Sequence, residues 1–230
     1  MSSSALFPAV AQNKPIREIA YDTLKHAIIT GDIPAGARIV ETEYASKMHI
    51  SRTPLREALR KLERDGLVEY LVRRGVIVRV FSTEDIYQIY TIRNALELLT
   101  LPAAVQNVTD ADITELRNEL NAMDALLKKE DIEALAPLAR AFHSHITRLS
   151  GLYRIIRAID SQDEFITRFS AMAIRQENRR NDAQREHHIM VDLLEKRDLP
   201  GLHKLVEAHI EHSKQKCLEA FVSQNNKAAQ

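Results

Sequence analysis

The spacing of apolar residues predicts helices over most of the chain. In residues 16–28 they recur every three or four positions, which is the period of a helix with one buried face, and Gly31 suits its C-terminal end. A second, short helix is expected over Glu41–Met48. A third helix should extend from Ser51 to Leu62, with an apolar stripe formed by Leu55, Ala58, Leu59 and Leu62.

Two β-rich runs, residues 67–72 and 76–80, come after the third helix and flank Arg73-Arg74-Gly75. They predict a hairpin with a basic tip. Three helices followed by such a hairpin are typical of a winged helix-turn-helix unit, in which the third helix is the reading helix and the hairpin tip is the wing. We expect this unit to occupy residues 14–81.

From residue 82 onward only the helical period remains, and no glycine occurs between Val76 and Ser150. Six helices are expected, over residues 84–106, 110–129, 131–149, 154–178, 182–196 and 198–222. The predicted fold class is therefore mainly α, with an N-terminal winged helix-turn-helix domain and a C-terminal all-α helical bundle over residues 82–222. The ends of the chain, residues 1–13 and 223–230, are expected to be disordered.

Composition adds two constraints to this picture. The 230 residues are 45% apolar and 28% charged, as in an ordinary globular protein. Because no run of about 18 apolar residues and no signal-peptide pattern occurs, we expect a cytoplasmic protein without membrane contact. Cys217 is the only cysteine, which excludes an intrachain disulfide and a cysteine metal cluster.

The formal net charge of zero conceals an asymmetry between the two predicted domains. Residues 14–81 carry 13 Lys and Arg against 9 Asp and Glu, whereas residues 82–230 carry 19 against 23, so the two parts differ as +4 and −4. This pattern favours a nucleic-acid-binding module joined to a sensing or assembly module. A solvated charged face is the alternative interpretation.

The reading helix carries a basic face as well as an apolar one. Pro54 suits its first turn, and Ser51 or Thr53 can cap its N-terminus. An exposed row of arginines spaced by four residues suits an anionic, planar-edged partner such as DNA. The row consists of Arg52, Arg56 and Arg60.

Four blocks of residues occur in order between residues 16 and 80. They are Gly31-Asp32-Ile33-Pro34-Ala35-Gly36-Ala37-Arg38-Ile39, Glu41-Thr42-Glu43-Tyr44-Ala45, Ser51-Arg52-Thr53-Pro54-Leu55-Arg56-Glu57-Ala58-Leu59 and Asp65-Gly66-Leu67-Val68. Together they resemble the DNA-binding domain of the GntR family of bacterial transcription regulators. In that family the positions matching Arg38, Arg52, Arg56 and Gly75 approach DNA.

The resemblance and the predicted helix face together define a set of expected DNA contacts. The hairpin tip is weighted below the helix, because an Arg-Arg-Gly turn can also be only a polar hairpin end. The set consists of Arg38, Ser51, Arg52, Thr53, Arg56, Arg73, Arg74 and Gly75.

Seven of the nine histidines lie in the predicted bundle. Three of them, His143, His187 and His209, fall on three different predicted helices, and three imidazoles that converge in a bundle core can bind Zn²⁺, Ni²⁺ or a similar ion. Spacing alone does not show that they converge. The remaining four are interpreted as ordinary core or surface residues: His145, His188, His203 and His212.

The residues around these histidines, Phe142-His143, Glu186-His187-His188-Ile189 and Ala208-His209, are similar to the FCD ligand-binding domain of FadR-type GntR regulators. Many members hold a metal with three histidines and an aspartate four residues before the first of them. Here that position is Ala139. Two outcomes stay open: one divalent ion bound with oxygens of an effector or water completing its shell, or a metal-free pocket whose histidines bind an anionic effector directly.

Arg93 interrupts an apolar helix face that should point into the bundle. A buried guanidinium needs a carboxylate, so Arg93 either forms a structural ion pair with Glu97 or binds the carboxylate of a small organic acid. The second interpretation resembles how this domain recognises sugar acids, hydroxy acids and dicarboxylates. Arg168 and Arg175 are weaker candidates. The expected effector-binding residues are Arg93, His143, His187, His209 and Arg175.

These observations predict a homodimeric DNA-binding transcription regulator, not an enzyme. We expect it to repress by binding a palindromic double-stranded operator and to respond to a small carboxylate-bearing metabolite. A metal-dependent hydrolase, or a metal sensor, built on the three histidines is the alternative, although no His-Glu-x-x-His motif supplies a general base. Architectural DNA binding without a ligand is a third hypothesis.

Overall fold

The computed structural model describes residues 14–228, and the predicted disorder of residues 1–13 lies outside them. The chain contacts define two compact units, one ending at Phe81 and the other beginning at Ser82. Within the described part of the chain, no helix combines the length and the apolar character needed to cross a membrane.

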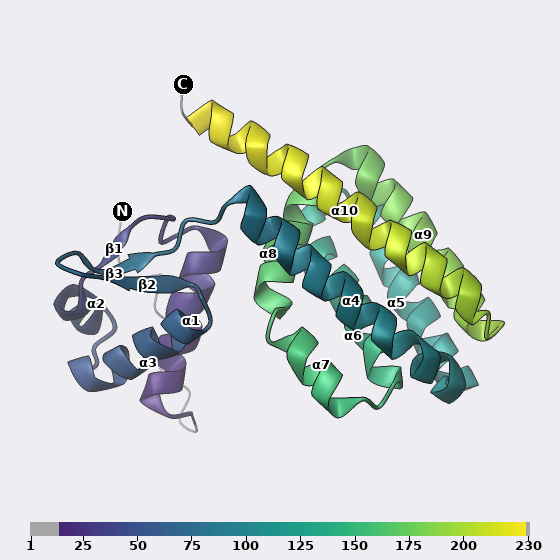
Figure 1. Ribbon diagram of the computed structural model, residues 1–230, viewed down its shortest axis with the longest axis horizontal. Helices are drawn as coiled ribbons and strands as arrows, with labels where there is room; N and C mark the ends of the chain where they lie inside the picture. The colour runs from purple at the N-terminus through teal and green to yellow at the C-terminus, as the bar shows by residue number, and fades with distance from the viewer. Residues whose placement is uncertain (1–13, 229–230) are drawn as a thin grey trace. The chain divides into compact units, whose positions relative to one another are not determined.

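The first unit combines three helices with a small sheet (Figure 1). α1 packs on α3, and Leu24, Leu55 and Leu59 are completely buried between them. Gly31 ends α1 with a φ of +88°, in the left-handed region that favours glycine. The elements are α1 (Ile16–Thr30), β1 (Arg38–Ile39), α2 (Glu41–Lys47), α3 (Arg52–Arg64), β2 (Val68–Leu71) and β3 (Gly75–Val78).

The sheet is antiparallel, with strand order β1-β3-β2. β2 and β3 form the predicted hairpin, in which Leu71 lies opposite Gly75. β1 is not among the predicted elements, and it adds a third strand in which Arg38 pairs with Ile77. The first unit is therefore a winged helix-turn-helix domain whose wing is backed by the strand that carries Arg38.

The second unit is all-α in its described part. α4 and α10 lie side by side (Figure 1), α8 and α9 pack against α10, and α5 packs against α6 and α9. α4 and α5 each begin at a capping box, in which the N-cap hydroxyl and a carboxylate three residues later satisfy each other's backbone N–H groups. The helices are α4 (Thr83–Asn107), α5 (Asp110–Lys128), α6 (Ile132–Leu149), α7 (Tyr153–Asp160), α8 (Asp163–Ile174), α9 (Glu177–Glu195) and α10 (Leu199–Ala228).

The mainly α fold class is confirmed, but several of the expected boundaries in the second unit differ. The single helix expected over residues 154–178 is broken at Ser161 and Gln162 into α7 and α8, because α7 packs on α4 whereas α8 also packs on α10. α9 consequently begins at Glu177. At the C-terminus, residues 223–228 continue α10 where a disordered tail was expected.

Candidate functional site

The two faces of α3 differ in exposure as their spacing predicts. Leu55, Leu59 and Leu62 are completely buried, whereas the Arg52 and Arg56 side chains are 60% and 47% exposed. Ser51 stands at the N-cap position and Thr53 in the first turn, but no side-chain hydrogen bond caps α3 within the described residues. Capping by Ser51 or Thr53 is therefore not observed, and both side chains stay exposed beside the arginines.

The wing brings together residues that are distant in sequence. Arg73 and Gly75 adopt positive φ angles of 68° and 78° at the turn between β2 and β3. A Cβ placed on Gly75 would lie 3.8 Å from the Nε and one terminal nitrogen of Arg38, so the Arg38 guanidinium passes close to the wing backbone. Arg38, Arg74 and Gly75 thus form one exposed basic edge of the sheet.

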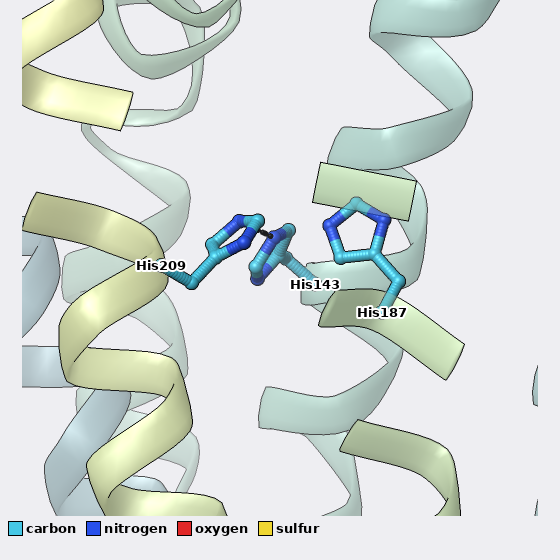
Figure 2. Close-up of side chains that lie close together, drawn as sticks. All are labelled: His143, His187 and His209. Atoms are coloured by element: carbon cyan, nitrogen blue, oxygen red, sulfur yellow. Dashed lines mark hydrogen bonds between the residues drawn. The ribbon is translucent and has the colours of Figure 1, made fainter. Parts of the chain in front are cut away.

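In the second unit, the three singled-out histidines converge (Figure 2). His143 on α6, His187 on α9 and His209 on α10 are each at most 5% exposed, and one ring nitrogen from each lies within 4.8 Å of the others. The Nε2 atoms of His143 and His209 are 3.1 Å apart. Packing of three separate helices therefore brings the three histidines together, which their spacing in the sequence could not show.

Carboxylates orient two of the rings from behind. Nδ1 of His143 lies 3.2 Å from a carboxylate oxygen of Glu97, and Nδ1 of His209 lies 2.6 Å from one of Glu186. When each Nδ1–H donates to its carboxylate, the Nε2 atoms of His143 and His209 both carry lone pairs, and these lone pairs face and repel each other. A cation placed between the two Nε2 atoms would be coordinated by both of them. Neither nitrogen of His187 has a hydrogen-bond partner among the described residues.

The electrostatics keep the cluster neutral. Burial lowers the pKa of His143 and of His187, and it lowers the pKa of His209 to about 3. Burial opposes ionisation of Glu97, but Arg93 and His143 outweigh it and hold the pKa of Glu97 well below its usual range. Neutral imidazoles backed by ionised carboxylates are the form that binds a divalent metal, so this donor set fits a zinc or nickel ion.

The histidines form one wall of a buried cavity of about 40 Å³. Arg93, Arg140 and Arg179 line the same cavity, whereas none of the lining residues in the described chain is acidic. Ala139 lies on the cavity wall one helical turn before His143, so a methyl group occupies the position from which a carboxylate would face the imidazoles.

Arg93 forms the ion pair that was one of its two expected roles, and it also lies on the cavity wall. Its Nε donates to Glu97 at 2.8 Å. Arg140 donates to Glu97 and Asp163, while its second terminal nitrogen is buried without a partner in the described structure. That nitrogen is an available donor for an anion.

The structure corrects the predicted set of effector-binding residues at three positions. Arg175 is exposed and does not line the cavity, because α8 ends at Ile174 and Arg175 therefore stands beyond the buried face of that helix. Arg140 and Arg179 do line it and were not among the expected residues. Arg179 and Glu186 are seven residues apart on one helix and pair at 2.8 Å, a two-turn spacing that was the available signal.

The other histidines of the bundle stay outside the cluster. His145 pairs with Glu119, and His188 pairs with Asp124. His212 lies 3.7 Å from the second oxygen of Glu186, with its side chain 58% exposed. His203 is exposed. Their interpretation as ordinary polar residues agrees with these positions.

Comparison with known proteins agrees with both domains. Residues 16–78 match the model of the gntR family of bacterial regulatory proteins, and residues 88–212 match the FCD domain. The chain belongs to the GntR family and carries the FCD domain of its FadR-type members. It is a DNA-binding transcription regulator.

Relatives and solved structures share this organisation over most of the chain. The chain is 31% identical to the Nta operon transcriptional regulator of Aminobacter aminovorans, over 80% of this chain and 86% of that protein. It is 30% identical to the "Probable D-xylose utilization operon transcriptional repressor" of Paenarthrobacter nicotinovorans, over 77% of each. A GntR regulator structure from Rhodococcus is 25% identical, with a TM-score of 0.71, over 88% of this chain and 97% of that one.

Proposed function

We propose that this regulator represses transcription as a homodimer and releases its operator when a small carboxylate-bearing metabolite occupies the cavity of the second unit. The observation that carries the proposal is that one buried cavity joins three converging imidazoles, of which His187 has both nitrogens without a partner in the described structure, to arginines. This combination suits a ligand with an acidic group at one end and an oxygen donor at the other.

For the DNA contact, α3 enters the major groove with Arg52 and Arg56 toward base edges, and Ser51 and Thr53 toward phosphates at the helix N-terminus. Arg38, Arg73, Arg74 and Gly75 approach the neighbouring minor groove through the wing. Two such units in a dimer match half-sites about one helical turn apart in a palindromic operator. All of these residues are exposed and five of them are arginines, which supports the assignment.

For the effector, Arg93 and Arg140 bind the carboxylate, and Ser170 supports it, since its hydroxyl lies 3.4 Å from a terminal nitrogen of Arg93. A volume of about 40 Å³ has room for about three water molecules, at roughly 10–15 Å³ for each. The cavity therefore favours a short hydroxy acid or dicarboxylate over a larger metabolite.

For the metal, His143, His187 and His209 hold one divalent ion, with zinc and nickel favoured by an all-imidazole donor set. Such an ion supplies a Lewis-acid site for an oxygen of the effector. Because no described residue lining the cavity is acidic, effector or water oxygens complete the shell. The same fact favours binding over hydrolysis, since no carboxylate there can act as general base.

The signal passes through α4. This helix contributes Arg93 to the cavity wall and Glu97 as the partner of Arg93, and it begins at Thr83, only two residues after Phe81 ends the DNA-binding unit. An effector carboxylate that competes with Glu97 for Arg93 changes the packing of α4. We infer that this change alters the spacing of the two reading helices, so that effector and operator each weaken the binding of the other.

The metal proposal predicts a difference in metal content. Protein purified without added metal should carry about one equivalent of zinc or nickel per chain by elemental analysis, and a His143→Ala/His187→Ala double variant should carry almost none. His145→Ala/His188→Ala is the matched control, because it removes two histidines from the same helices outside the cluster. Equal, negligible metal content in wild type and cluster variant would refute metal binding.

The effector proposal predicts stabilisation by short organic acids. In a thermal-shift panel with and without zinc, a short hydroxy acid or dicarboxylate should raise the melting temperature, and an Arg140→Gln variant should lose most of that rise. The stabilising acid should also release operator DNA. Chemical turnover of the acid, measured by chromatography, would instead support the hydrolase hypothesis.

A further inference from the structure

Glu41 is an acidic residue placed beneath the basic face of the reading helix. It is the first residue of α2, and its carboxylate accepts hydrogen bonds from Nε of Arg56 at 3.2 Å and from a terminal nitrogen, Nη2, at 2.8 Å. A terminal nitrogen of Arg52 lies 3.7 Å from the same oxygen. One carboxylate therefore holds one of the two principal arginines and attracts the other.

The exposed fractions of the side chains show that the two arginines, and not Glu41, face outward. The Glu41 side chain is 20% exposed, whereas those of Arg52 and Arg56 are 60% and 47% exposed. The hydrogen bonds from Arg56 lower the pKa of Glu41, so the carboxylate stays ionised. The anion thus lies under the arginines, close to the surface that meets phosphates.

A negative charge at this place opposes DNA binding, and helix capping does not account for it. Glu43 stands in the same first turn of α2 and offers the same favourable charge to the helix N-terminus, and in the described structure neither a hydrogen bond nor an ion pair joins it to Arg52 or Arg56. The two-point contact with Arg56 is specific to Glu41. A role directed at the arginines explains this geometry, and a role at the helix end does not.

The contact uses only one edge of the Arg56 guanidinium. Glu41 occupies the edge formed by Nε and Nη2, which leaves Nη1 and the second hydrogen of Nη2 directed away from the carboxylate. Those donors have the fork geometry that binds O6 and N7 of guanine. Arg56 held in this way is ordered before it meets a base, while its charge is already balanced and attracts phosphates less.

We propose that Glu41 is a positioning residue that sets the discrimination between operator and random DNA. It holds Arg56 oriented for a base edge and reduces the neutralisation of phosphates by Arg56 and Arg52 on random sequence. This inference rests on the proposed reading of DNA by α3. Removing the charge of Glu41 should raise the affinity for random DNA more than the affinity for the operator.

The test compares Glu41→Gln with Glu43→Gln, which removes the same charge from the same helix turn. An operator duplex is selected from a random library with wild-type protein, and Kd is measured by fluorescence anisotropy for this duplex and a scrambled one over a salt series. For Glu41→Gln we expect the operator-to-scrambled affinity ratio to fall about tenfold, within the range of one bidentate base contact. On scrambled DNA, the slope of log affinity against log salt should steepen by about one.

Two outcomes would overturn the role of Glu41. In the first, the operator-to-scrambled affinity ratio and the salt slope of Glu41→Gln equal those of Glu43→Gln within twofold. In the second, Glu41→Gln binds both duplexes more weakly by the same factor and has a lower melting temperature, as a purely structural role requires. Arg56→Ala in the same assay separates this inference from the proposed function. If Arg56→Ala kept the wild-type ratio, reading by α3 would itself be refuted, and the role of Glu41 with it.

Discussion

Replacing Arg52 or Arg56 with alanine is expected to abolish specific operator binding while leaving the fold intact. Both side chains are about half exposed, outside the buried Leu55–Leu62 stripe of α3. One bidentate base contact contributes about 1–3 kcal/mol of discrimination. Because the proposed dimer presents each arginine twice, the loss should be about 2–6 kcal/mol, or roughly 30-fold to 10⁴-fold in operator affinity.

Nuclease footprinting on a selected operator measures this loss, and thermal unfolding with sedimentation analysis checks fold and assembly. Arg64→Ala is the matched control, since it removes an exposed arginine from the other end of the same helix. The control should weaken binding slightly and equally on all sequences, as a phosphate contact or a distant charge does. Footprints like those of wild type from both Arg52→Ala and Arg56→Ala would count decisively against α3 as the reading helix.

Replacing Ala139 with aspartate is expected to strengthen metal binding about a hundredfold and to make it independent of the effector. Ala139 is buried on the cavity wall one turn before His143. A carboxylate there would face neutral imidazoles and the three arginines that line the cavity, so its own burial is offset by opposite charge. It would supply the anionic ligand that the proposed function assigns to the bound acid in wild type.

In wild type, zinc and a short dicarboxylate should therefore each tighten the binding of the other, by the same factor. Isothermal titration of zinc, with and without malonate and against acetate as a single-carboxylate control, measures this coupling. Ala139→Asp should bind zinc tightly without malonate and show a coupling factor near one. Ala139→Asn adds almost the same bulk without charge, so equal zinc affinities of the two variants would refute the prediction.

Much of the first unit follows from short stretches of sequence. The two faces of α3 are both set by spacings of three and four residues inside one helix, and an isolated helical segment already carries that information. The hairpin is likewise local, since its two runs flank a single turn. For the same reason, the sequence predicted exposed Arg52 and Arg56 beside a buried stripe, and the structure has them there.

The second unit shows where local information ends. The period of apolar residues predicted helices, but it missed the break at Ser161 and Gln162, because that break serves packing against α4 and α10 and not local propensity. Arg175 was placed wrongly because α8 ends at Ile174, one residue short of it. Arg140 was missed because its neighbours in space, Glu97 and Asp163, come from other helices.

The sequence by itself determined the fold class, the family and the two faces of the reading helix, since these depend on residues close together in the chain. It also identified three histidines and an interrupted apolar face at Arg93 as candidates. Only the tertiary structure decided that the histidines converge, that Arg93 both pairs with Glu97 and lines the cavity, and that Glu41 holds Arg56. The physical reason is that each of these depends on how separate helices pack, which no single helical period encodes.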